Sequence, residues 1–150
     1  MTKKSLVSFI GAVALMIFST LVAADTKTDV QAIEHSMKAQ FDKPDAPLKV
    51  SPVTVNGDYA VAGWIQGDRG GRALLKNEHG KWSIQVCSGD GLTKATTLEM
   101  TGMDKNAANK LAKAVAIAEK DLPQATLKLF ASFEGMVNVQ EGNHGHGHPH

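Results

Sequence analysis

The sequence predicts an α+β domain with an N-terminal helix, a four-stranded antiparallel meander and three C-terminal helices packed on the sheet. Three observations carry this prediction. Apolar residues recur with a helical period over 28–41, alternate with polar residues over 53–87, and return to a helical period from about residue 92. Because the strands come in one block and most helices follow, we expect the helices to lie on one face of an antiparallel sheet.

The first helix is expected over residues 28–41. Thr28 and Gln31 have the spacing of a capping box, and Pro44 and Pro47 follow the last turn. The apolar side chains fall on one stripe, which indicates that the helix packs against another element. These residues are Val30, Ile33, Met37 and Phe41.

The alternating region predicts four strands with one apolar face. Asn56-Gly57 suits a tight hairpin turn, and turns are also expected at 67–71 and 77–80. On the fourth strand the alternation groups Trp82 with Ile84 and Val86, which would place Cys87 on the opposite face. The segment 67–72 contains two arginines and could form an anion-binding nest, although a hairpin turn is the commoner structure for such a segment.

Three helices are expected after the sheet. The first runs from about Leu92 to Thr101, with Asp90 as a candidate cap. A second covers about 105–121 and is capped by Asp104. The third begins at Pro123 and ends before Gly135, and residues 140–150 are expected to form a disordered, histidine-rich tail.

The N-terminus has the pattern of a secretory signal peptide. Lys3 and Lys4 precede an uncharged stretch over 6–22, and small residues at 22–24 suit cleavage after Ala24. A retained membrane anchor is the alternative, but the stretch is shorter than the about 20 apolar residues that a spanning helix needs. We therefore expect a signal peptide at 1–24, a domain at 25–139, a mature chain with no membrane span, and a periplasmic location.

The composition of the mature chain limits the kinds of partner. Cleavage leaves 126 of the 150 residues and removes two of the 16 basic side chains, against 15 acidic ones. A nearly neutral surface gives no reason to expect nucleic acid or an anionic membrane as a partner. The single cysteine, Cys87, excludes an internal disulfide, so its thiol is buried, bound to metal or redox-active.

The C-terminal tail is the most conspicuous chemical feature. Four histidines alternate with glycine or proline, so several rings can turn toward one ion, and imidazole nitrogens favour copper, nickel and zinc. A purification tag and a functionless solvated end are the alternatives, but tags are normally uninterrupted histidine runs. The predicted metal ligands are His144, His146, His148 and His150.

Cys87 is a further candidate metal ligand. A soft thiolate suits Cu⁺, whereas the ordinary alternative is a half-buried structural thiol among core methionines. A nucleophilic role needs a neighbouring base, and nothing in the sequence brings His35 or His79 to Cys87; both histidines are expected at the surface. Thioethers could come from Met100, Met103 and Met136.

Five segments of the predicted domain form one further pattern: QFDKPDAPL at 40–48, GDYAVAGW at 57–64, GDRGGRALL at 67–75, CSGD at 87–90 and LFASFEG at 129–135. Together, in this order, they resemble the family of small exported bacterial proteins called copper uptake system-associated proteins. The resemblance implies association with a copper import system and with an envelope copper receptor or transporter. It supplies no ligand set, although Cys87 and Asp90 belong to one of the matching segments.

The residues and the resemblance lead to one functional hypothesis and two alternatives. The hypothesis is a non-enzymatic periplasmic accessory protein of copper uptake that binds Cu²⁺ or Cu⁺. One alternative is a binding domain whose tail buffers zinc, nickel or cobalt. The other, from a different class, is a thiol-dependent redox protein that uses Cys87.

Overall fold

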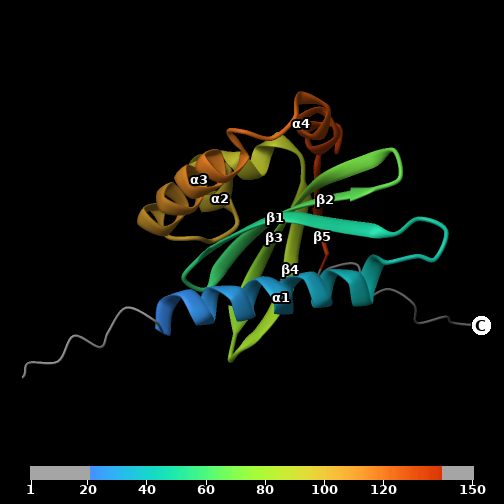
Figure 1. Cartoon of the computed structure of the whole chain (residues 1–150). Coiled ribbons are helices and arrows are strands. Elements are labelled where there is room, and N and C mark those ends of the chain that lie inside the picture. The colour runs from blue at the N-terminus through green and yellow to red at the C-terminus, as the bar shows by residue number, and fades with distance from the viewer. Residues whose placement is uncertain (1–20, 140–150) are drawn as a thin grey trace, which may run out of the picture.

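A central antiparallel sheet organises the chain. The computed structural model describes residues 21–139, with side chains from residue 26 onward. Within this part, one long helix precedes four strands, and a 3₁₀ turn, three helices and a short fifth strand follow (Figure 1). The elements are α1 (Leu21–Phe41), β1 (Leu48–Asn56), β2 (Tyr59–Gln66), β3 (Arg69–Glu78), β4 (Lys81–Ser88), η1 (Asp90–Thr93), α2 (Ala95–Met100), α3 (Lys105–Glu119), α4 (Gln124–Ala131) and β5 (Met136–Asn138).

The strands form a meander in the order β1-β2-β3-β4-β5, with every neighbouring pair antiparallel. Two-residue turns join β1 to β2, β2 to β3 and β3 to β4, because the flanking residues pair directly across each turn. Gly57 and Gly67 open the first two turns with positive φ, and His79 and Gly80 both have positive φ in the third. The first turn was predicted at Asn56-Gly57, and it is centred one residue later.

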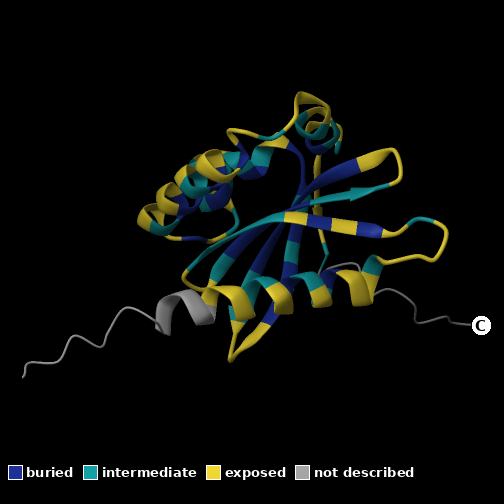
Figure 2. Cartoon of the chain, in the orientation of Figure 1, coloured by how far each residue is buried: buried dark blue, intermediate teal, exposed yellow. Residues whose placement is uncertain are grey.

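Helices cover both faces of the sheet. The helix α1 packs on one face, while α2 and α3 pack on the other, as Figure 1 shows below and above the strands. Figure 2 shows the buried residues concentrated along the strands between these layers. The α+β class is therefore confirmed, but the prediction of helices on one face is wrong. The strands β2 and β3 have buried residues on both faces, because helices cover both. On β2, for example, Ala60 and Ala62 face α1 and Val61 faces α3.

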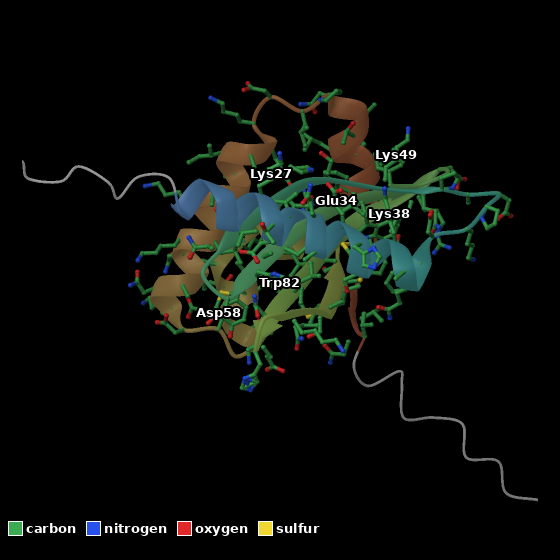
Figure 3. The ribbon with its side chains drawn as sticks, turned by 60° about the horizontal axis from the view of Figure 1, so that its bottom comes forward. Lys27, Glu34, Lys38, Lys49, Asp58 and Trp82 are labelled. Atoms are coloured by element: carbon green, nitrogen blue, oxygen red, sulfur yellow. The ribbon has the colours of Figure 1, made fainter. Side chains whose placement is uncertain are left out.

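The helix α1 is longer than predicted and is amphipathic in its packing. It begins at Leu21 rather than at residue 28, so Thr28 lies inside the helix and not at its cap. Ile33 and Met37 are buried against the sheet. Figure 3 views the molecule from this side, with Lys27, Glu34 and Lys38 along the helix and Trp82 on β4 behind it. Asp29 accepts a 2.9 Å hydrogen bond from Nε1 of Trp82, which ties α1 to β4. Ser36 also donates a hydrogen bond to the carbonyl of Trp82.

A β-bulge in β4 changes which residues share a face. Leu75 pairs with Ile84, but the preceding residue Leu74 pairs with Val86, so Gln85 is the extra residue. Ile84 therefore faces α1 with Trp82, whereas Val86 faces α3. Cys87 returns to the α1 face. The prediction that Cys87 lies opposite Trp82 and Ile84 is wrong, because strict alternation cannot account for one inserted residue.

Glycines in the strands allow α4 and the segment after it to approach the sheet closely. A Cβ on Gly63 would lie 2.5 Å from the ring of Phe130, and one on Gly70 would lie 3.0 Å from the backbone of Leu129. The turn expected at 67–71 is consequently only two residues long, and β3 begins at Arg69. Gly70 and Gly71 are strand residues whose missing side chains make room for α4 and Phe133.

The helix boundaries after the sheet agree only in part with the sequence. Asp104 caps α3 as predicted, accepting hydrogen bonds from the backbone N–H groups of Asn106 and Ala107 at 3.0 and 3.1 Å. These bonds lower the pKa of the Asp104 carboxyl. Asp90 was expected to cap a helix, but it binds Arg72 instead, and Gly89 precedes η1. The helix α4 follows Pro123 as predicted and ends at Ala131.

The strand β5 was not predicted from the sequence. It follows Gly135, pairs with β4 from Ser88 to Val86, and is followed by a hydrogen bond of 3.0 Å from the N–H of Val139 to the carbonyl of Gln85. Within the described part of the chain, no helix is long and apolar enough to cross a membrane.

Candidate functional site: a cavity beside Cys87

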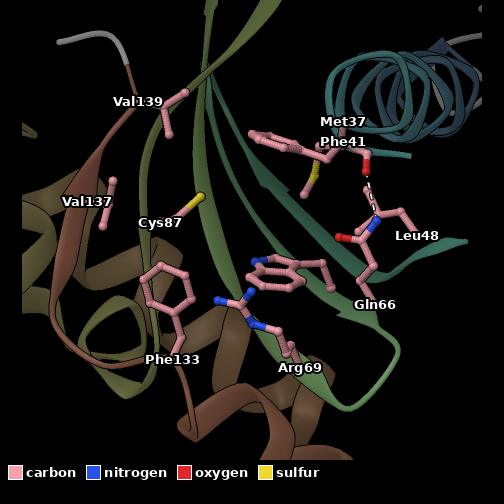
Figure 4. Close-up of a pocket in the computed structure, with 10 residues that line it drawn as sticks. Met37, Phe41, Leu48, Gln66, Arg69, Cys87, Phe133, Val137 and Val139 are labelled. Carbon is pink, nitrogen blue, oxygen red and sulfur yellow. Dashed lines mark hydrogen bonds between the residues drawn. The ribbon is translucent and has the colours of Figure 1, made fainter. Parts of the chain in front are cut away.

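A cavity of about 320 Å³ lies between α1, the sheet and the segment that follows α4. Its floor is buried and apolar, and partly exposed side chains surround its mouth. In Figure 4 the sulfur of Cys87, the sulfur of Met37 and the guanidinium of Arg69 point toward this space. The lining residues are Met37, Phe41, Leu48, Trp64, Gln66, Arg69, Cys87, Phe133, Val137 and Val139.

The Cys87 thiol is held in its neutral form. Burial raises the pKa of this thiol to about 11, because a thiolate in the apolar cavity would lose most of its hydration. Among the described residues, no group of three histidine, cysteine or acidic side chains is close enough to hold a metal ion. The Cys87 thiol is therefore protonated, as in an unreactive structural cysteine. It nevertheless lines a cavity, as a residue of a binding site does.

The methionines predicted to lie near Cys87 are elsewhere. Val137 pairs with Cys87, whereas Met136 pairs with Ser88. Because neighbouring strand residues alternate between faces, the side chain of Met136 lies on the face of the sheet opposite to Cys87. Met103 belongs to the core between the sheet and α3, and Met100 is 82% exposed. The thioether that does share the cavity with Cys87 belongs to Met37, which is 1% exposed. The sequence placed Met37 only on the packed side of the first helix.

Aromatic packing and a side-chain amide fix the walls of the cavity. The rings of Trp64 and Phe133 meet edge to face with 5.9 Å between their centroids. The side-chain amide of Gln66 donates to the carbonyls of Phe41 and Ala46, each at 2.8 Å, and so joins the end of α1 to β2. Because these contacts come from three separate parts of the chain, the cavity is a product of the tertiary fold.

The two arginines of the segment 67–72 have separate roles. Arg72 is buried, donates to both carboxylate oxygens of Glu119 at 2.7 and 2.6 Å, and contacts Asp90 at 3.0 Å. Its guanidinium also lies 5.2 Å from the ring centroid of Phe130. Burial opposes the charge of Arg72, but Glu119 and Asp90 together raise its pKa. Arg69 instead lines the cavity, so the two guanidinium groups do not form one anion-binding nest.

The histidines are divided between described and undescribed parts of the chain. His35 on α1 and His79 in the β3–β4 turn are exposed, as expected for surface residues. The four predicted ligands at 144–150 lie outside the described residues, so the structure does not place them. It does place the residues from which the tail departs: β5 pairs with β4, Val137 lies opposite Cys87, and Val139 lines the cavity.

Sequence reasoning identified Cys87 but missed the side chains that surround it. Phe133 was assigned to a helix, Met37 to a packed stripe and Arg69 to a turn. Only the apolar character of Met37, Phe133 and Val137 was a usable signal, and it does not distinguish a cavity wall from a filled core. Neither protein-family models, nor curated protein sequences, nor solved structures gave a match to this chain, so function is inferred from its residues and geometry.

Proposed function

We propose that this protein is a non-enzymatic, periplasmic copper-binding accessory protein associated with copper uptake. The observation that carries the proposal is the sequence of the tail, in which His144, His146, His148 and His150 alternate with small or turn-forming residues. Neutral imidazoles are strong ligands for borderline divalent ions, and Cu²⁺ is the most tightly bound of the series. Closely spaced imidazoles of this kind are suited to capturing an ion rather than to catalysis.

The geometry of β5 supports a link between this tail and the folded domain. Val139 is hydrogen-bonded beside β4, and His144 is five residues farther along the chain. Five residues span up to about 17 Å when extended. An ion bound by the first tail histidine is therefore within reach of the cavity that contains Cys87 and Met37. In this proposal the histidines are the primary ligands, and the two sulfur atoms are a secondary site for Cu⁺.

The state of Cys87 favours this function over thiol-dependent redox chemistry. A catalytic thiol needs a lowered pKa and a nearby base, whereas burial raises the pKa of Cys87 to about 11. No histidine lines the cavity among the described residues. A metal ion can still displace the thiol proton, because binding and deprotonation are coupled.

The family resemblance supports the choice of copper and of an envelope partner. The matching segments surround the cavity: 40–48 connects α1 to β1, 67–75 contains Arg69, and 129–135 contains Phe133. We therefore propose an envelope copper receptor or transporter as the partner of the folded domain. The alternative, a tail that buffers zinc, nickel or cobalt, is distinguished by one property. A dedicated copper protein prefers copper more strongly than an ordinary imidazole cluster does, and a general buffer does not.

Deletion of residues 142–150 tests the proposal most directly. We expect the deletion to abolish tight Cu²⁺ binding measured by competition titration, and to impair growth under copper limitation. The control variant Cys87→Ser keeps Cu²⁺ binding and loses only affinity for Cu⁺. Unchanged copper stoichiometry and growth after the deletion would contradict the proposal, and a copper preference no greater than the Irving–Williams order would favour the general buffer.

A further inference from the structure

The cavity beside Cys87 has a second property that the copper function does not use. Its walls are aliphatic and aromatic, and Arg69 is the one charged side chain among its lining residues. Arg69 has no acidic partner within the described part of the chain, in contrast to Arg72, which is bound by Glu119 and Asp90. An apolar space with one uncompensated guanidinium is complementary to an anion with an apolar body.

We propose that this cavity binds a medium-chain fatty carboxylate, with its alkyl chain on the Met37 and Cys87 floor and its carboxylate on Arg69. The volume of about 320 Å³ is at the lower end of the range for small-molecule sites. At roughly 30 Å³ for each water-sized group, it holds about ten heavy atoms. An alkyl chain of about eight to ten carbons is therefore the size that fits.

The exposure of the lining residues gives the ligand its orientation. Met37 and Leu48 at the floor are 1% and 4% exposed, whereas Val137 on β5 is 51% exposed and Arg69 is an exposed residue. The apolar end of a carboxylate therefore enters first and the charged end remains at the mouth. Covering Val137 and the half-buried Trp64 removes apolar surface from water, which supplies the driving force.

Guanidinium recognition explains why the ligand is a carboxylate rather than an alcohol. A guanidinium presents two parallel N–H donors to the two oxygens of a carboxylate, and such charge-assisted bonds are about twice as strong as neutral ones. An alcohol of the same length gains the apolar contacts but not this pair of bonds. The comparison of decanoate with decanol therefore isolates the contribution of Arg69.

The full chain, with Trp82→Phe added so that fluorescence reports on Trp64, is titrated with decanoate below its micelle concentration. We expect saturable binding with one site, and slower labelling of Cys87 by a methanethiosulfonate when the site is filled. Arg69→Gln is expected to weaken decanoate binding at least tenfold and decanol binding less than twofold. The matched control Lys49→Gln removes an exposed charge outside the cavity. It should change the affinities for decanoate and for decanol by no more than twofold.

A second variant keeps the test independent of Arg69. Val137→Trp fills the mouth from an exposed strand position and should abolish decanoate binding while the circular dichroism spectrum is retained. The proposal is overturned by the absence of saturable binding, by Cys87 labelling that decanoate does not slow, or by equal effects of Arg69→Gln on acid and alcohol. It is also overturned if decanoate binds only after residues 142–150 are deleted, because the chain's own tail would then be the occupant. Copper binding by the tail is measured separately and does not enter these readouts.

Discussion

The Cys87 thiol shows how one buried group combines two chemical tendencies. It lines a cavity and is therefore accessible to small molecules, yet burial raises its pKa to about 11. Since the thiolate is the reactive species, its low population and not its position limits the chemistry of Cys87 at neutral pH. The same neutrality keeps the floor of the cavity apolar.

Alkylation of Cys87 should be slow in the folded protein. At pH 8 we expect iodoacetamide to react on the order of 100-fold more slowly than with the protein unfolded in guanidinium, because an ordinary thiol has a pKa of about 8.5. The raised pKa of Cys87 favours the protonated thiol. The alkylation rate of the folded protein should therefore keep rising as the pH approaches the thiol pKa of about 11. Mass spectrometry of quenched samples measures both rates. A folded-state rate that levels off below pH 9 would refute the assignment of a neutral, buried thiol.

At the scale of elements, the buried ion pair of Arg72 joins β3 to α3 and the turn before α2. Glu119 is on the last turn of α3, Asp90 is on η1, and Phe130 of α4 lies against the same guanidinium. Three elements that are distant in sequence are thus positioned by one side chain. Removal of Glu119 would leave the buried charge of Arg72 with only the exposed carboxylate of Asp90 as its partner.

The two carboxylates should contribute unequally to stability. Glu119→Ala is expected to lower the free energy of unfolding by about 3 kcal/mol, because its carboxylate side chain is only 10% exposed and binds Arg72 twice. Asp90→Ala is the matched control and should cost at most about 1 kcal/mol, since its side chain is 64% exposed. Urea denaturation measures both values. Equal losses would show that burial does not determine the strength of this network.

The contact between Gly63 of β2 and Phe130 of α4 should be intolerant of a single added methyl group. Gly63→Ala places a Cβ 2.5 Å from the ring of Phe130. We expect this substitution to lower the free energy of unfolding by about 2–3 kcal/mol. Adding Phe130→Leu should recover part of this loss, because the smaller side chain leaves space for the methyl group. Thermal unfolding of both single variants and the double variant measures the coupling. Strict additivity would contradict the proposed steric cause.

At the scale of the whole molecule, the fold and the histidine-rich tail are expected to be energetically separate. Among the described residues, the two buried cores extend from Ile33 in α1 to Val115 in α3. We therefore expect deletion of 142–150 to change the free energy of unfolding of the metal-free protein by less than about 0.5 kcal/mol. A larger loss would show that the tail packs on the domain.

Metal binding should depend on pH in the way that histidine ligands require. Protonation removes the nitrogen lone pair that binds the ion, and the ordinary histidine pKa is about 6.5. Copper affinity is therefore expected to reach its full value above about pH 7 and to fall steeply below about pH 6. Equilibrium dialysis at pH 7.5 and pH 5 provides the measurement, with the deletion variant as control. Unchanged loading at pH 5 would exclude the histidines as ligands.

The sequence by itself determined the α+β class, the order of helix, meander and helices, the cap at Asp104 and the start of α4 after Pro123. These features depend on local periodicity, on turn residues and on backbone groups only a few residues apart. The histidine ligands of the tail are likewise a property of local spacing, and they remain a prediction.

Only the tertiary structure decided which face each strand residue occupies and what surrounds Cys87. One inserted residue at Gln85 places Cys87 on the α1 face. Gly70 and Gly71, expected in a turn, are strand residues that pack closely against Leu129 of α4 and against Phe133. The strand β5 exists because β4 offers an edge, which its own three residues do not encode. Bulges, edge pairing and cavities arise from contacts between distant segments, so no local pattern specifies them.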